Sequence, residues 1–295
     1  MKVVGLISGG KDSLYNLYLA KKNGHELVCL ANLHPPPGES EIDSYMYQSV
    51  GAEGIKAMAA ALQLPLYRKE IKGKPMNTTN EYRELQGDEV EDLFCLLSTI
   101  QNQNPEIEAV SCGAILSQYQ KSRLDNVCQR LGLKTLCYLW GRDQAELLDD
   151  MIQDGIDAII IKVASAGLTT KHLGMTLKEA KEPLHEANKK YGAHICGEGG
   201  EYETYVIDSP LHESRISVDL CEAVLHADNA VQPVAYLKLS KVTLISKNST
   251  VSDNQPDDPS PSKTVSSQRP LQLPKLPTGQ SSGGGGGCSA ASSQG

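Results

Sequence analysis

Two short stretches of this sequence carry residue types that could do chemistry, and the first, SGGKDS at residues 8–13, suits the binding of a phosphate. Together with Gly5, this stretch nearly matches the Walker loop, which needs Ser or Thr after its lysine to hold magnesium. Asp12 occupies that position instead. In addition, the apolar run 3–7 predicts a buried strand that passes straight through Gly5. The Walker interpretation is therefore rejected.

The same six residues are predicted to form a phosphate-binding turn between a strand and a helix. Leu14 and Leu17 recur at helical spacing after the turn, and the unpaired N–H groups at a helix N-terminus attract anions. The expected roles are close backbone approach at Gly9 and Gly10, hydroxyl donors at Ser8 and Ser13, positive charge at Lys11 and a hydrated Mg²⁺ at Asp12. An ordinary glycine-rich turn is the alternative.

The second stretch, GEGGEYET at residues 197–204, combines three glycines with three glutamates. Such a composition suits neither a helix nor the interior of a strand. It lies between the apolar pair 195–196 and the β run 205–207. The sequence therefore predicts an acidic loop at a sheet edge, where binding sites are common. A solvated turn without a functional role is the alternative.

Composition limits the class of protein. The chain has 295 residues, 40% of them hydrophobic, which is enough for a packed core in one large or two modest domains. Its formal net charge is −8. A protein that binds nucleic acid directly normally presents a basic surface, so this balance weighs against such a partner.

The cysteines and histidines limit the compartment and the metals. The eight cysteines show no CxxC spacing, and neither a signal peptide nor a membrane-spanning apolar run is present. We therefore expect a cytoplasmic protein without a membrane partner, in which each cysteine is a small buried hydrophobe. No histidine pair has metal-ligand spacing, so the only metal we expect is the Mg²⁺ at the phosphate-binding turn.

The order of elements predicts an α/β fold. Short apolar runs alternate with amphipathic stretches, the pattern of a Rossmann-like parallel sheet with helices on both faces. The strands of this sheet are expected at 3–7, 25–33, 64–71, 108–115 and 134–140. A smaller α/β unit is expected to follow, with a strand at 157–164, a helix at about 176–190 and a strand at 215–227.

The chain is divided into three parts on this basis. The domain predicted to carry the phosphate-binding turn covers 1–145, the smaller α/β substrate domain covers 146–248, and a polar tail covers 249–295. Because the tail consists largely of Ser, Pro, Gln and Gly, it has too few apolar residues to offset the entropy of ordering and is expected to be disordered.

The motifs in their order resemble a known family. SGGKDS resembles the pyrophosphate loop of the N-type ATP pyrophosphatases, the PP-loop superfamily, whose members transfer AMP and release pyrophosphate. The chain resembles diphthine–ammonia ligases over residues 1 to about 245, on the motifs SGGKDS, DSYMYQSVG, GDEVEDL, GAILSQYQKSR, CYLW, KHLG and CGEGGEYET. The resemblance implies ATP-dependent amidation of the diphthine carboxylate on elongation factor 2, through an acyl-adenylate and with ammonium as co-substrate.

The resemblance also implies site residues. Catalytic roles fall to Lys11 and, for ammonium and its proton, to Glu198, Glu201 or Glu203, which the sequence does not rank. Ala31, Asn32 and Gly113 are expected beside the nucleotide. The residues expected to bind substrate are Tyr45, Gln48, Ser117, Tyr119, Gln120, Arg123, Trp140, His172 and Tyr202. Some of the aromatic ones, together with Tyr47, are expected to form a cage for the trimethylammonium group. For several of these, a core or solvated position is the alternative.

Other interpretations stay open at this stage. One is another adenylating PP-loop enzyme, such as a tRNA-modifying one; thiolation of tRNA would need paired reactive cysteines and a basic face, neither of which the sequence displays. Another is a non-catalytic ATP-binding module, which has no need of the acidic loop. Fungal and plant relatives often continue into further domains where this chain has its polar tail. The sequence carries no signal for the oligomeric state.

Overall fold

A computed structural model describes residues 1–37, 44, 46–227 and 232–247. The predicted tail therefore lies outside the described residues. Within these ranges no helix is long and apolar enough to cross a membrane.

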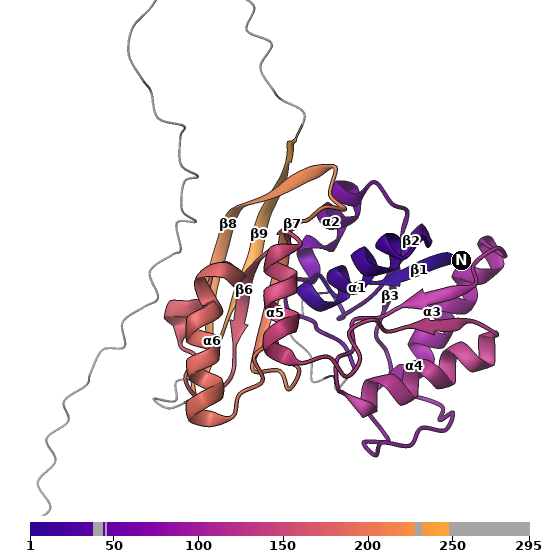
Figure 1. The fold of residues 1–295 in the computed structure, drawn as a ribbon. Helices are drawn as coiled ribbons and strands as arrows, with labels where there is room; N and C mark the ends of the chain where they lie inside the picture. Colours follow the sequence, from indigo (N-terminus) through magenta and orange to yellow (C-terminus); the bar gives the residue numbers. More distant parts are fainter. Residues whose placement is uncertain (38–43, 45, 228–231, 248–295) are drawn as a thin grey trace, which may run out of the picture.

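The first half of the chain forms the expected parallel sheet (Figure 1). Its strand order is β3-β2-β1-β4-β5, and every neighbouring pair is parallel. The strands are β1 (Lys2–Leu6), β2 (Glu26–His34), β3 (Leu66–Glu70), β4 (Ala109–Ser111) and β5 (Lys134–Leu136). The helices that alternate with them are α1 (Lys11–Lys22), α2 (Ile55–Leu62), α3 (Glu89–Gln103) and α4 (Gln118–Leu131). The fold class predicted for this half is confirmed.

Helices cover both faces of this sheet because the strand side chains alternate between two cores. On β2, Leu30 belongs to the cluster that contains Leu14 of α1 and Met58 of α2. Its neighbours Cys29 and Ala31 belong to the cluster under α3 and α4. Successive residues of a strand point to opposite faces, so a continuous apolar strand needs a helical layer on each side.

The second half forms a separate sheet, in which every pairing is antiparallel (Figure 1). Its order is β7-β6-β9-β8. The strands are β6 (Asp157–Val163), β7 (Tyr202–Asp208), β8 (Ser214–Ala227) and β9 (Val234–Ser246), and the helices are α5 (Gln144–Gln153) and α6 (Leu177–Tyr191). The predicted strands and helix exist, whereas their antiparallel pairing is a feature that local patterns did not indicate. The predicted division at residue 145 falls in the first turn of α5 and stays a prediction.

Strand β7 attaches the second sheet to the turn that follows β1. The Val206 N–H donates to the Gly9 carbonyl at 2.9 Å, and the Lys11 N–H donates to the Thr204 hydroxyl at 3.0 Å. The two halves also share one hydrophobic cluster, which includes Leu14 and Tyr205. The turn 8–13 is therefore fixed both by its own sheet and by β7 of the second sheet.

Candidate functional site

The N-terminus of α1 is open to an anion. Gly10 is the N-cap residue of α1 and supplies no side-chain hydrogen bond to the helix end. Gly9 has a φ of 94°, a backbone conformation that glycine adopts more readily than other residues. Within the described residues, the N–H groups of Asp12 and Ser13 make no hydrogen bond. Gly113 lies directly against this turn, because a Cβ there would be 2.4 Å from the Asp12 carbonyl carbon. These features fit a phosphate group at the helix end.

Lys11 is a buried cation at the centre of the site, with 2% of its side chain exposed. Its Nζ donates to Asp12 Oδ2 at 2.9 Å and to the Cys196 carbonyl, and it lies 4.8 Å from the centroid of the Tyr202 ring. Burial by itself lowers the pKa of Lys11, but the Asp12 carboxylate and the other negative groups outweigh it, so the pKa lies above its ordinary value. Lys11 therefore stays positively charged.

Asp12 has an oxygen that fits a metal ion. Its Oδ1 is buried and has no hydrogen-bond partner in the structure, while Oδ2 accepts from Lys11. Burial raises the pKa of Asp12 above its ordinary value, and the Lys11 ammonium acts against that rise. A hard oxygen ligand beside an anion site suits a Mg²⁺ ion that keeps most of its waters. Among the described residues, no cluster of three or more His, Cys, Asp or Glu side chains could hold a metal by itself.

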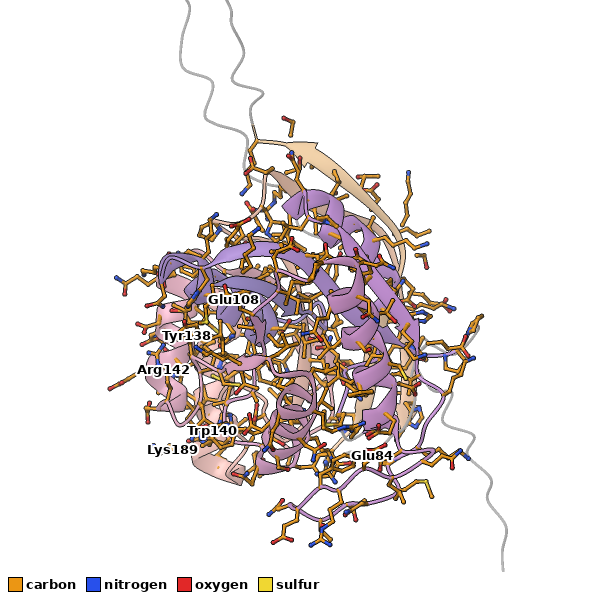
Figure 2. All side chains as sticks on the ribbon, turned by 90° about the vertical axis from the view of Figure 1, so that its right-hand side faces the viewer. Glu84, Glu108, Tyr138, Trp140, Arg142 and Lys189 are labelled. Atoms are coloured by element: carbon orange, nitrogen blue, oxygen red, sulfur yellow. The ribbon has the colours of Figure 1, made fainter. Side chains whose placement is uncertain are left out.

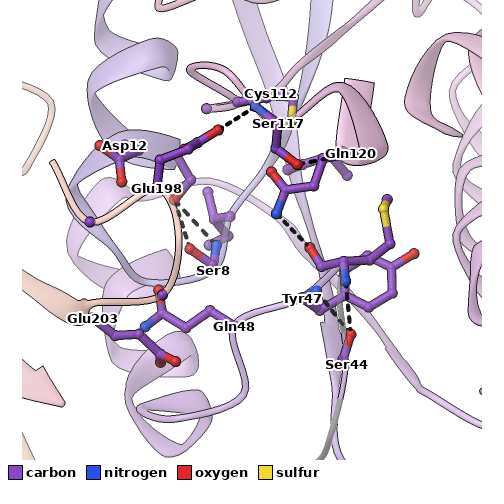
Figure 3. Close-up of a pocket in the computed structure, with 18 of the residues that line it drawn as sticks. Ser8, Asp12, Ser44, Tyr47, Gln48, Cys112, Ser117, Gln120, Glu198 and Glu203 are labelled. Atoms are coloured by element: carbon purple, nitrogen blue, oxygen red, sulfur yellow. Dashed lines mark hydrogen bonds between the residues drawn. The ribbon is translucent and has the colours of Figure 1, made fainter. Parts of the chain in front are cut away.

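A cavity of about 500 Å³ opens over this turn and is lined by both halves of the chain. In the view of Figure 3, Asp12, Glu198 and Glu203 lie on one side of it, and Ser44 and Tyr47 on the other. The predicted site residues that line it are Ser8, Lys11, Asp12, Ser13, Ala31, Asn32, Gln48, Gly113, Ser117, Tyr119, Gln120, Glu198, Tyr202 and Glu203. Those that do not are Gly9, Gly10, Arg123, Trp140, His172 and Glu201. Tyr45 lies outside the described residues.

The three glutamates of the acidic loop have different surroundings. Glu198 Oε1 accepts from the N–H groups of residues 115, 116 and 117 at 3.1, 2.8 and 2.8 Å. Glu201 accepts from the His194 and Gly199 N–H groups, each at 2.8 Å, and so orders its own loop. Glu203 Oε1 receives a hydrogen bond from Lys162 Nζ at 3.1 Å. The structure thus distinguishes carboxylates that the sequence left equivalent.

Several lining side chains hold the walls of the cavity together. Asn32 donates to the Ile7 carbonyl and accepts from Arg68, both at 2.9 Å. Gln48 donates to the carbonyls of Val50 at 3.0 Å and Thr204 at 3.2 Å. Asn32 therefore ties β2 to the end of β1, and Gln48 ties its own segment to β7.

Arg123, which was predicted to bind substrate, supports the wall of the cavity from behind. The residue is fully buried, and its guanidinium lies 3.3 Å from the centroid of the Tyr119 ring. It also donates to the carbonyls of Thr79 at 3.0 Å and Asn77. Arg123 therefore orients Tyr119, which does line the cavity.

Trp140 and His172 lie away from the cavity. Figure 2 shows Tyr138, Trp140 and Arg142 along one side of the molecule, in the segment between β5 and α5. His172 ends the short 3₁₀ helix Thr170–His172 and accepts from the Thr169 N–H at 2.8 Å. It lines a second pocket with residues of α6.

The lining residues that were not singled out from the sequence include Ser44, Cys112 and Thr204. Thr204 closes the GEGGEYET motif, so its position gave a usable signal. Cys112 was interpreted as a buried hydrophobe like the other cysteines, whereas it is partly exposed in the cavity. Sequence spacing does not reveal that Cys112 reaches the cavity, because the strand next to it in the sheet is distant in the chain.

Comparison with known proteins identifies the family. The family model of the diphthamide synthase N-terminal domain matches residues 1–135, and that of the C-terminal domain matches residues 143–240. This chain belongs to the diphthine–ammonia ligase family. It is 52% identical to mouse diphthine–ammonia ligase over 255 residues, which cover 85% of this chain and 95% of the mouse protein. The human diphthine–ammonia ligase is 50% identical over 258 residues, 86% of this chain and 96% of the human protein.

The resemblance and the enzyme class inferred from the sequence motifs are confirmed by this family assignment: diphthine–ammonia ligases are enzymes. The fission yeast diphthine–ammonia ligase is 52% identical over 239 residues, but the match covers 81% of this chain and only 39% of the yeast protein. A predicted tRNA methyltransferase subunit from Methanocaldococcus jannaschii aligns with a TM-score of 0.32 at 15% identity, over 71% of this chain and 98% of that one, and supports no further conclusion.

Proposed function

We propose that this diphthine–ammonia ligase family member uses ATP to convert the diphthine carboxylate of elongation factor 2 into an amide, with ammonium as the nitrogen donor. The reaction would pass through an acyl-adenylate and release AMP and pyrophosphate. One observation carries the proposal: the open N-terminus of α1 and the carboxylates of Glu198 and Glu203 line the same cavity. An anion site beside an acidic loop suits a reaction between a polyphosphate, a carboxylate and an ammonium ion.

The α1 turn supports the adenylation half of the proposal. A carboxylate is a poor acyl donor, and linkage to AMP gives it a good leaving group. The N–H groups of Asp12 and Ser13 would hold the phosphates that leave, and the buried Lys11 ammonium would stabilise charge that develops on them. Magnesium held at Asp12 Oδ1 would supply further neutralisation of phosphate charge.

The acidic loop supports the amidation half. Ammonium must lose a proton before its nitrogen can attack an acyl group. We assign this role to Glu203, which lines the cavity and accepts a hydrogen bond from the Lys162 side chain at 3.1 Å. Glu198 also lines the cavity, but its Oε1 accepts three backbone hydrogen bonds, and Glu201 bonds within its own loop. Glu198 would then contribute negative charge and hold the loop in place.

The aromatic contact for the trimethylammonium group is assigned to Tyr47. A quaternary ammonium cannot be hydrogen-bonded and is bound by aromatic faces. The Tyr119 ring already faces the Arg123 guanidinium at 3.3 Å, and the Tyr202 ring already faces Lys11 at 4.8 Å. Tyr47 lines the cavity, and its hydroxyl donates to the Glu89 carbonyl at 3.3 Å. A protein substrate of this kind also agrees with a cytoplasmic location.

The test is to incubate the full chain with ATP, Mg²⁺, ammonium and elongation factor 2 that carries diphthine. The expected products are AMP and a factor whose mass has changed by the replacement of a carboxyl with a carboxamide. Glu203→Gln should abolish formation of the amide. Glu53→Gln is the control and should not, because Glu53 is an exposed acid in the turn directly before α2. Formation of ADP, or ATP binding without AMP release, would overturn the proposal and favour a phosphoryl-transfer or non-catalytic role.

A further inference from the structure

Two cysteines that are distant in the sequence meet beside the cavity. Ser111 and Leu136 are paired at the ends of β4 and β5, so the next residues, Cys112 and Cys137, lie side by side. The Cys112 N–H donates to the Leu136 carbonyl at 3.1 Å, which extends the pairing to this point. Neighbouring strands are about 4.8 Å apart, within the Cα separation of about 4.4–6.8 Å that a disulfide spans.

These two thiols differ from most of the other cysteines of the chain. Both are free and partly exposed, and Cys112 lines the cavity, where a small solute can reach it. In contrast, Cys29 and Cys196 are buried, and burial raises the pKa of each to about 12. The expectation that each cysteine is a small buried hydrophobe is therefore wrong for Cys112 and Cys137, which are partly exposed, and for Cys95, which is exposed.

Cys137 has surroundings that favour its thiolate. The neighbouring Cys112 thiol lowers the pKa of the Cys137 thiol below its ordinary value, and the Lys121 ammonium acts in the same direction against the effect of burial. Lys121 is fixed at this place by an ion pair of 2.6 Å with Asp125 and by the Trp140 ring, whose centroid lies 5.6 Å from Nζ. The thiolate is the nucleophilic form of cysteine.

We propose that Cys112 and Cys137 form a redox modification site, at which a hydroperoxide produces an intramolecular disulfide that weakens nucleotide binding in the cavity. The Cys137 thiolate attacks a peroxide oxygen and breaks the O–O bond, which leaves a sulfenic acid and hydroxide. The Cys112 thiol then attacks the sulfenic sulfur, forms the S–S bond and releases water. With hydrogen peroxide, two thiols are oxidised and one peroxide is reduced to two waters, and an external dithiol reverses the change.

The backbone next to Cys112 connects the disulfide to the phosphate-binding turn. Gly113 is packed so closely on α1 that a Cβ there would lie 2.4 Å from the Asp12 carbonyl carbon and 2.5 Å from the Ser13 nitrogen. A close-packed contact of this kind transmits a displacement instead of absorbing it. Rotation of Cys112 into a disulfide therefore shifts the N–H groups that face the cavity.

The first experiment maps the disulfide and needs no nucleotide. The full chain is treated with hydrogen peroxide, alkylated, digested and analysed by mass spectrometry. We expect a peptide that joins Cys112 to Cys137, that dithiothreitol removes and that Cys137→Ser lacks. Cys95→Ser changes an exposed cysteine on α3 and should leave the cross-link intact. Free thiols, a sulfinic acid without a cross-link, or a cross-link to the neighbouring Cys128 would each overturn the proposal.

The second experiment measures how strongly the disulfide and ATP binding affect each other. Oxidation should weaken ATP binding, measured by calorimetry, about tenfold in the wild type, and it should have no effect in Cys137→Ser, which leaves the cavity lining unchanged. Linkage is reciprocal, so saturating ATP should raise the reduction potential of the pair by about 30 mV for a tenfold effect. Lys121→Gln should slow disulfide formation severalfold. Equal ATP affinity of the oxidised and reduced chains would overturn the regulatory part of the proposal.

Discussion

Glu198 accepts a hydrogen bond from the Ser117 N–H at 2.8 Å, although the two residues are 81 positions apart in the chain. The same Oε1 atom accepts from the two preceding N–H groups, and Ser117 is itself the N-cap of α4. One carboxylate thus fastens the acidic loop of the second half to the helix that follows β4. The two loops joined by this contact both line the cavity.

We predict that Glu198→Ala lowers the free energy of unfolding by about 3 kcal/mol, because it leaves three N–H groups without their charged acceptor. Glu198→Gln keeps a neutral acceptor oxygen and should cost less. Urea denaturation measures both values, with Glu53→Gln as an exposed control. Equal stability of Glu198→Ala and the wild type would show that water replaces this acceptor.

We predict that Lys11→Met lowers the rate of AMP release about 10²–10³-fold, the usual effect of removing one charge-stabilising donor. Lys11→Arg should not restore it, because the Lys11 ammonium fits between Asp12, a backbone carbonyl and the Tyr202 ring with 2% of its surface exposed. Lys22→Met, at the exposed end of the same helix, is the control. AMP release is followed by chromatography, and full activity of Lys11→Met would exclude the role assigned to this residue.

We predict that Gly113→Ala destabilises the protein by about 3 kcal/mol, since the added methyl group would overlap the backbone of α1 at 2.4 Å. Gly10→Ala should cost clearly less, because its nearest neighbour is the end of the flexible Gln48 side chain at 2.7 Å. Thermal or urea unfolding compares the two variants. A smaller loss for Gly113→Ala than for Gly10→Ala would contradict the close packing described here.

We predict that His212 makes the stability depend on pH. This histidine is 4% exposed, pairs through Nδ1 with the Ser209 hydroxyl at 2.7 Å and has no partner for Nε2. Burial lowers its pKa from 6.5 to about 4. Between these values the unfolded chain binds a proton that the folded chain does not, so stability is complete above pH 6.5 and is lost as the pH falls towards 4.

The expected loss from His212 is about 2 kcal/mol of unfolding free energy between pH 7.5 and pH 5. Urea titrations at the two pH values measure it. In His212→Gln the side chain does not titrate, so this part of the pH dependence should disappear even though the variant is less stable at neutral pH. An identical pH slope in both proteins would rule His212 out as its source.

The sequence by itself determined those features of the fold and of the site that depend on residues close together in the chain. Apolar runs and helical spacing located the five parallel strands and their helices, and SGGKDS together with the other motifs indicated the family. The limits of elements were less certain: the strand expected at 134–140 ends at Leu136. An apolar run continues past the last ladder hydrogen bond, so hydrophobicity alone does not mark where a strand stops.

Only the tertiary structure decided which of the glutamates at 198, 201 and 203 face the cavity, that Arg123 supports Tyr119 from behind, and that Cys112 and Cys137 meet. It also decided that the second sheet is antiparallel. Each of these facts depends on the register between segments far apart in the chain. Local patterns fix which face of an element is apolar, whereas register is fixed by the packing of whole elements against each other.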